Sequence, residues 1–233
     1  MEVVQGIHLL PSFRVNVYLL LGDSITLIDT GWPGNAKRIL SYLSNLGYGP
    51  SDVSSIVLTH CHVDHFGSAA EVKEKTGATV AVHENDVGCI SGVTPYPAPR
   101  GILGVAFRIV KPFLRLHSVE VDLPLNDGME VPNSRGLKVI HTPGHTMGSI
   151  CLYHSKLKAL FSGDTVICES GEVREPVEST SMNPSEARRS VMRLSELNFD
   201  LILPGHGTPI VHEASSRVRN LAVTLERRIY GGR

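Results

Sequence analysis

The sequence has almost no net charge. Its 233 residues include 22 Lys and Arg and 23 Asp and Glu, which leaves a formal net charge of −1. A protein that binds nucleic acid by neutralising phosphates needs a basic excess, so this balance argues against that class of function. We therefore expect no nucleic-acid partner.

The sequence also lacks a long hydrophobic run and a leader. No apolar stretch approaches the ~20 residues that a membrane-spanning helix needs. The first ten residues, MEVVQGIHLL, do not show the basic segment, apolar core and small-residue cleavage site of a secretory signal. These absences predict a cytoplasmic protein with no membrane partner.

Cysteine is scarce, with four residues in the chain. Cys61, Cys89, Cys151 and Cys168 show neither C-x-x-C nor zinc-finger spacing, so the sequence predicts reduced thiols in a cytoplasm, with a disulfide between two of the four as the alternative. The 42% hydrophobic and 19% charged residues are typical of a globular chain. Since the sequence shows no internal repeat and no linker, we expect a single domain over residues 1–233.

Strand and helix patterns occur in two groups along the chain. The sequence predicts strands over 2–10, 13–21, 24–29, 55–59, 79–82, 119–121, 137–141, 149–153, 159–162 and 200–203. It predicts helices over 35–46, 68–75, 84–91 and 185–197, and a terminal helix from about 213. Strands mixed with helices in both halves favour two sheets flanked by helices.

An insertion at about residues 88–117 separates the two β-rich regions. Ile102, Val105, Ile109 and Phe113 recur in it at helical spacing. This stripe is typical of a surface helix packed on the core, with a substrate lid or the face of a homodimer as alternatives. We expect the insertion to be a substrate lid, in which four side chains are available for substrate contact: Tyr96, Arg100, Phe107 and Arg108.

Histidine is frequent for a metal-binding residue type, with 11 copies against four cysteines, and five of the histidines follow predicted strands. The first cluster reads His60-Cys61-His62-Val63-Asp64-His65. In an extended chain, side chains two positions apart project to the same side, so His60 and His62 can reach one ion. Cys61 and Val63 should point the other way, into packing, with a thiolate ligand at Cys61 as the alternative. Asp64 and His65 stand where the chain turns toward a helix and can reach a second ion. Imidazole and carboxylate are suitable ligands for zinc, iron or manganese.

Three further strand ends offer ligands of the same kind. Thr142-Pro143-Gly144-His145 contributes an imidazole, Gly163-Asp164 a carboxylate able to bridge two ions, and Pro204-Gly205-His206-Gly207 another imidazole. Each segment alone is a weak signal, because Gly-His and Gly-Asp pairs are common in turns. Their combination at four strand ends predicts a metal site.

These residues together resemble the metallo-β-lactamase fold hydrolases, in particular their glyoxalase-II-like branch. The resemblance extends from Leu27-Ile28-Asp29-Thr30-Gly31 to Pro204–Gly207. It implies an α/β (α+β) fold, an αββα sandwich of two mixed sheets flanked by helices. It also implies that one metal ion is held by His60, His62 and His145, and a second by Asp64, His65 and His206, with Asp164 between them. Asp29 would steady the histidine loop, and His141 is a candidate for a similar supporting role.

The resemblance implies two divalent metal ions, with zinc expected first and iron or manganese as alternatives. A hydroxide bridging the ions would cleave an ester, thioester or lactone of a small-molecule substrate, with Asp64 and Asp164 as the catalytic carboxylates. The alternatives are a persulfide dioxygenase-like enzyme with a single iron, a phosphodiesterase or β-lactamase-type hydrolase of the same fold, and a metal-binding module without activity.

Overall fold

Seven strands form the first sheet, and they lie side by side in the order of the sequence. The computed structural model describes residues 1–110, 113–114 and 116–230. Antiparallel pairs join β1 through β4 and parallel pairs join β4 through β7, so the sheet is mixed. The strands are β1 (Glu2–Val4), β2 (Ile7–Ser12), β3 (Val15–Leu21), β4 (Ile25–Ile28), β5 (Val53–Val57), β6 (Thr79–His83) and β7 (Leu123–Leu125).

The second sheet has four strands in the order β13-β10-β9-β8, and a separate two-stranded hairpin lies beside it. Because β10 pairs with β13 in parallel and with β9 antiparallel, this sheet is also mixed. Its strands are β8 (Leu137–His141), β9 (Ile150–His154), β10 (Ala159–Gly163) and β13 (Leu201–Pro204), and the hairpin is β11 (Ile167–Glu169) and β12 (Glu172–Arg174).

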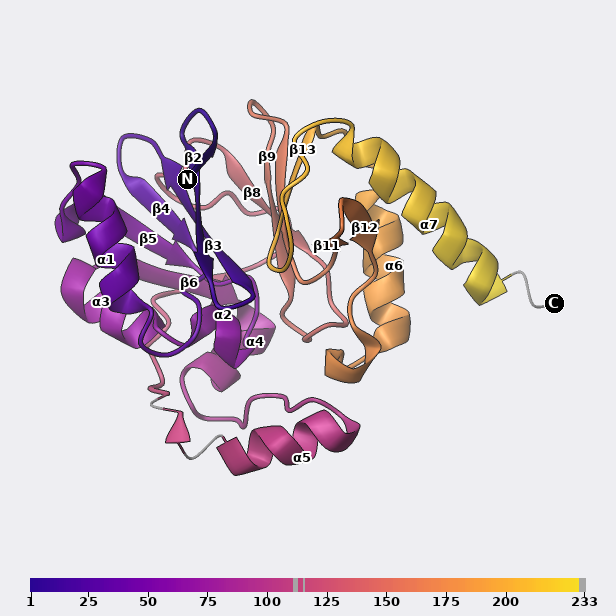
Figure 1. Ribbon diagram of the computed structural model, residues 1–233, viewed down its shortest axis with the longest axis horizontal. Coiled ribbons are helices and arrows are strands. Elements are labelled where there is room, and N and C mark those ends of the chain that lie inside the picture. The colour runs from indigo at the N-terminus through magenta and orange to yellow at the C-terminus, as the bar shows by residue number, and fades with distance from the viewer. Residues whose placement is uncertain (111–112, 115, 231–233) are drawn as a thin grey trace.

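Helices cover the outer faces of the two sheets (Figure 1). On one side these are α1 (Ala36–Asn45) and α3 (Ala69–Thr76), and on the other α6 (Pro184–Leu194) and α7 (Ala214–Tyr230). The other helical elements are η1 (Pro50–Asp52), α2 (Val63–Phe66), α4 (Glu84–Ile90), α5 (Gly101–Val110) and η3 (Glu178–Thr180). The architecture is the αββα sandwich that the resemblance implied. No helix in the described part of the chain is long and apolar enough to cross a membrane.

Alternating side chains on the central strands divide the core into layers. On β3, Leu19 packs with the helix residues Ile39 and Val72, whereas its neighbour Tyr18 packs between the sheets against Phe161, at 5.5 Å between ring centroids. A strand that is buried on both faces has a nearly continuous run of apolar residues. This explains why a strand over residues 15–21 could be recognised in the sequence.

The strand predictions differ from the structure in three places. The strand predicted over 2–10 is divided by a turn at residues 5–6 into β1 and β2. Residues 119–121 form no strand, and the edge strand β7 lies at Leu123–Leu125 instead. The hairpin of β11 and β12 was not predicted at all. The three-residue strands of both regions carry too few residues for a recognisable alternation, so pairing with neighbouring strands decides their position.

Helix α5 lies at one end of the sandwich, apart from the two sheets (Figure 1). The apolar stripe of the insertion does not pack on the core as its spacing suggested, because its residues are exposed: Ile102, Val105, Ile109 and Phe113. The helix contacts the core through Phe107 instead. Residues 111, 112 and 115 of the predicted lid lie outside the described residues.

Candidate metal centre

Five strands, β4, β5, β8, β10 and β13, end at the same edge of the sandwich. The loop after each strand carries a candidate metal ligand or, after β4, Asp29, which was expected to steady the histidine loop. Strands β4 and β5 run parallel, as do β10 and β13, and β8 runs in the same direction as β10 because both are antiparallel to β9. The carboxyl ends of parallel strands meet at one edge, which is where open α/β sheets place their ligands. The topology thus brings together segments that the sequence separates by up to 177 residues, from Asp29 to His206.

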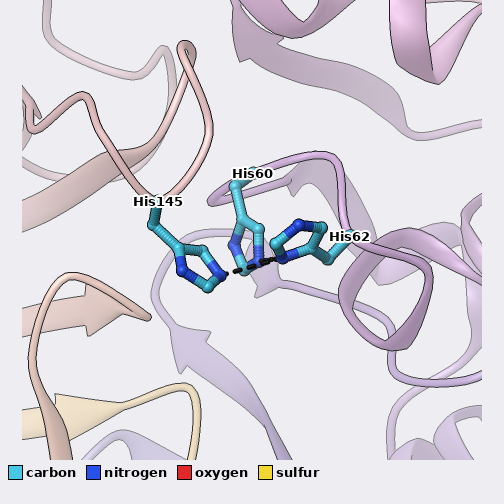
Figure 2. Close-up of side chains that lie close together, drawn as sticks. All are labelled: His60, His62 and His145. Carbon is cyan, nitrogen blue, oxygen red and sulfur yellow. Dashed lines mark hydrogen bonds between the residues drawn. The ribbon is translucent and has the colours of Figure 1, made fainter. Parts of the chain in front are cut away.

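Three imidazoles form the first group at this edge (Figure 2). His60 and His62 come from the loop between β5 and α2, and His145 comes from the loop between β8 and β9. His62 Nδ1 lies 3.1 Å from His60 Nε2 and 2.8 Å from His145 Nε2. The three nitrogens face one another and could hold one metal ion.

Asp64, His65 and His206 form the second group. Asp64 and His65 belong to the short helix α2, while His206 follows β13. His206 Nε2 lies 3.3 Å from His65 Nε2 and 3.4 Å from Asp64 Oδ2. These three atoms could hold a second ion.

Asp164 lies between the two groups. Its Oδ2 is 3.2 Å from both His145 Nε2 and His206 Nε2, and its Oδ1 is 3.4 Å from His65 Nε2. The Oδ1 atom is buried and has no hydrogen-bond partner in the described part of the chain. A buried carboxylate oxygen without a partner is costly unless a cation neutralises it.

Four imidazoles face the other ligands with Nε2, and the Nδ1 atom of each of these rings contacts an oxygen atom on its other side. Such contacts orient a ligand ring and select its tautomer. The pairs are His60 with Thr59 Oγ1 at 3.1 Å, His145 with Ser181 Oγ at 3.3 Å, His65 with Asp29 Oδ2 at 2.8 Å and His206 with Arg14 O at 2.5 Å. Asp29 also accepts hydrogen bonds from the Thr59 N–H and hydroxyl, so it supports the histidine loop at two points.

The electrostatics of the two groups differ. Burial lowers the pKa of His62 to about 3 and holds that of His60 well below its usual range, so both rings are neutral at pH 7. Burial acts the same way on His65 and His206, but nearby carboxylates, Asp164 first among them, outweigh it and raise their pKa values to about 9 and about 11. A cation bound in the second group would therefore displace protons.

The donor set fits divalent metal ions. Ligands about 2.0–2.1 Å from a tetrahedral zinc lie about 3.3 Å from one another, close to the separations found in both groups. Nitrogen lone pairs that face each other at such distances repel unless a proton or a cation lies between them. The mixture of imidazole and carboxylate suits zinc, iron and manganese.

Two other sequence predictions concern neighbours of the ligands. Cys61 points away from the groups and is buried in the core, as its position between two projecting histidines predicts. His141 lies outside both groups: its ring stacks on His83 with 3.8 Å between centroids, and its Nε2 contacts Met147 O at 2.9 Å. The structure therefore does not bring His141 to the ligands.

Three supporting groups were missed in the sequence. Thr59 could have been recognised, because it directly precedes His60 at a strand end. Ser181 and the backbone carbonyl of Arg14 carry no sequence signal, since they approach the site only through tertiary folding.

A cleft of about 1100 Å³ opens onto the site. Its lining includes five of the candidate ligands: His62, Asp64, His145, Asp164 and His206. Much of the remaining wall is apolar, with side chains from several loops and from α5: Phe13, Trp32, Val63, Pro97, Pro99 and Phe107. Of the four insertion residues expected to contact substrate, only Phe107 lines this cleft within the described residues. Tyr96 packs near Phe66, and Arg100 donates a hydrogen bond to Met182 O.

Comparison with known proteins places these observations in one family. The family model of the metallo-beta-lactamase superfamily matches residues 10–206. The probable metallo-hydrolase YflN of Bacillus subtilis is 29% identical over 231 residues, covering 90% of this chain and 86% of that protein. A hydroxyacylglutathione hydrolase of Ectopseudomonas mendocina is 31% identical over 195 residues, covering 82% of this chain and 61% of that protein.

Solved structures agree with this assignment. The metallo-beta-lactamase family protein TTHA1429 of Thermus thermophilus superposes with a TM-score of 0.74 at 27% identity, covering 99% of this chain and 82% of that one. TTHA1623, solved in a di-iron-bound form, superposes with a TM-score of 0.69 at 26% identity, covering 91% and 97%. The chain belongs to the metallo-beta-lactamase superfamily and is a metallo-hydrolase with a histidine-rich metal site.

Proposed function

We propose that this metallo-hydrolase is dinuclear and cleaves an ester, thioester or lactone bond of a small molecule. In this proposal His60, His62 and His145 hold one ion, and Asp64, His65 and His206 hold the other. The observation that carries it is the position of Asp164, whose carboxylate lies within 3.4 Å of nitrogens from both groups. A carboxylate with two oxygens so placed can serve both ions.

Two ions held in this way would lower the pKa of water toward 7 and polarise the substrate carbonyl, so no serine or cysteine nucleophile is required. The protein's own groups divide the remaining work. Asp64 lies at the open side of the site, with its side chain 22% exposed against 9% for Asp164. Its carboxylate is thus placed to direct a proton of the attacking water toward the leaving group, while Asp164 keeps the two groups together.

The cleft favours a substrate with a bulky apolar group. Phe13, Trp32 and Phe107 line it. Of the cations in its wall, Arg188 and Arg228 are paired with Glu175 and Arg174 with Glu169, whereas Arg14 has no ion pair in the described part of the chain. Cations already neutralised by a neighbouring carboxylate contribute little to binding an anionic group. The apolar wall would therefore supply much of the binding energy for the acyl part of the substrate.

Metal analysis followed by a substrate panel tests this function. We expect about two zinc ions per chain, with iron or manganese as the alternative occupants, and turnover of at least one thioester, ester or lactone. The panel should include phosphodiesters and a β-lactam as comparison substrates. One iron per chain together with oxygen uptake would establish the dioxygenase alternative instead, and metal-loaded protein that hydrolyses nothing in the panel would contradict the proposal.

Replacing Phe107 with Ala tests the proposed role of the insertion. Phe107 is half-buried and lines the cleft, so we expect kcat/KM for substrates with long acyl groups to fall by about 5–30-fold, mainly through KM, because about 1–2 kcal/mol of apolar contact is lost. Short acyl substrates should be little affected, and metal content should not change. The measurement is steady-state kinetics across a series of acyl lengths.

Ile109→Ala is the matched control for Phe107→Ala. Ile109 lies on the same helix but is 66% exposed and does not line the cleft within the described residues. Equal losses in the two variants, or equal losses for short and long acyl groups, would show that α5 does not contact substrate.

A further inference from the structure

The loops that carry the first histidine group come from different sheets, so contacts between the loops must fix the distance between their ligands. His60 and His62 follow β5 of the seven-stranded sheet, and His145 follows β8 of the four-stranded sheet. One backbone hydrogen bond joins the loops near this point, from Ile150 N to Thr59 O at 2.9 Å. A second connection is a buried carboxylate that belongs to neither loop.

Asp86 on α4 provides this connection. Its Oδ2 accepts hydrogen bonds from the Cys61 N–H at 2.9 Å and from the Thr146 hydroxyl at 2.7 Å, and its Oδ1 accepts one from the Gly148 N–H at 2.8 Å. Cys61 stands between His60 and His62, and Thr146 directly follows His145. One carboxylate therefore contacts the backbone between two ligands and the residue next to the third.

The packing around Asp86 is tight. Its side chain is buried, with 2% of the residue exposed. A Cβ atom on Gly148 would lie 2.5 Å from Asp86 Cγ, so only glycine allows the loop to approach so closely. Thr146 is fixed further by Ser149, whose Oγ lies 2.9 Å from the Thr146 hydroxyl and accepts from the Thr146 N–H at 2.8 Å. The geometry leaves the carboxylate little freedom to move.

The three contacts of Asp86 require an acceptor at both oxygens. Both N–H groups can only donate, and an ionised carboxylate accepts at either atom. Asn has the same shape as Asp but presents one acceptor oxygen and one NH₂ group. In an Asp86→Asn variant, either the Cys61 or the Gly148 N–H would face that NH₂ group and lose its partner inside the core, which is costly.

We propose that Asp86 is a positioning residue for the metal centre, holding the His60–His62 loop and the His145 loop at the spacing that one ion needs. The inference rests on the metal site of the proposed function but not on the identity of the substrate. Asp86 touches neither the substrate nor a ligand ring. It acts through Cys61 and the Thr146–Gly148 segment, and its loss should weaken metal binding before it changes the chemistry.

Metal titration of the whole protein tests this proposal without relying on turnover. The metal-free protein and its Asp86→Asn variant are titrated with Co²⁺, whose visible spectrum reports ligand number and geometry, and with Zn²⁺ against a competing chelator. We expect Asp86→Asn to lower affinity for the ion of the first histidine group by about 10–100-fold and to alter the Co²⁺ spectrum, because supporting contacts typically contribute on this scale. Excess metal should restore part of the activity.

Asp122→Asn is the control, since Asp122 also accepts a backbone hydrogen bond, from Val80 N at 2.8 Å, but lies away from the ligands. Thr146→Val and Thr146→Ser provide a second test if Asp86→Asn fails to fold. The serine keeps the hydroxyl that reaches Asp86, so its metal affinity should stay near that of the unchanged protein, while the valine should show the loss.

Several results would overturn the role of Asp86: unchanged Co²⁺ affinity and spectrum in Asp86→Asn, an equal loss in Asp122→Asn, or equal affinities in the two Thr146 variants. Failure of the proposed function gives a different result. If the unchanged protein binds two ions but hydrolyses no ester, thioester or lactone, the proposed substrate class is wrong. The role of Asp86 is then still decided by the metal affinities of Asp86→Asn and its control. If that protein binds no metal, both are wrong.

Discussion

Replacing Asp164 with Asn should reduce kcat/KM for hydrolysis by about 10²–10³-fold. Enzymes typically lose about this much rate when a single electrostatic contact at the reacting centre is removed. The carboxylate lies within 3.4 Å of three imidazole nitrogens from both ligand groups. Asn keeps the shape of the side chain but removes the negative charge and one acceptor oxygen. We therefore expect the occupancy of at least one ion to fall together with the rate.

The measurement is kcat/KM on the best substrate of the panel, together with metal content per chain. Asp200→Asn is a suitable control, because Asp200 carries the same charge near the opposite end of β13, where it pairs with Lys158 at 3.6 Å. Full activity in Asp164→Asn, with both ions still bound, would show that Asp164 does not serve the two ions. Equal losses in both variants would point to net charge and not to the site.

Removing the metal should abolish hydrolysis and lower the melting temperature. A ligand at about 1000 times its Kd stabilises the folded protein by about 4 kcal/mol, which corresponds to roughly 8–16 °C in a chain of this size. The physical reason lies in the buried ligand atoms. The charged Asp164 carboxylate has an oxygen with no hydrogen-bond partner among the described residues, and ring nitrogens face each other between His62 and His145 and between His65 and His206. Without a cation, protons on His65 and His206 offset the charge of Asp164. The buried neutral rings of His60 and His62 still face each other at 3.1 Å with nothing between them.

Differential scanning calorimetry before and after dialysis against a chelator measures this effect. Restoring zinc, iron or manganese one at a time should recover both the melting temperature and the activity, and should identify the ion that the site prefers. The Asp164→Asn variant should respond less to the chelator than the unchanged protein. Undiminished activity in protein shown to be metal-free would rule out a metallo-hydrolase mechanism.

Much of the fold could be predicted because its central strands are buried on both faces. Segments such as 15–21 and 159–163 are mostly apolar and are bounded by turn residues, so local pattern is enough to find them. The misplaced strand at 119–121 and the missed hairpin at 167–174 show the limit of this approach. Those short strands form where another segment offers backbone partners, and the partner is distant in the sequence.

The helix of the insertion shows a different limit. The helical spacing of Ile102, Val105 and Ile109 correctly predicted a helix in the insertion, but this apolar stripe was misread as a buried face. An apolar stripe shows that a helix is amphipathic. It does not show which side meets the core, because that depends on the position of the helix relative to the sheets.

The sequence by itself determined which residues could bind metal, because the short-range geometry of His60-x-His62-x-Asp64-His65 and the strand-end positions of His145, Asp164 and His206 are local properties of the chain. The resemblance already implied how these ligands are grouped, whereas only the tertiary structure decided how they are held. Ser181, the Arg14 carbonyl and Asp86 reach the site from elements that share no motif with it. Hydrogen-bond partners across the junction of two sheets depend on strand order and loop approach, which no local pattern encodes.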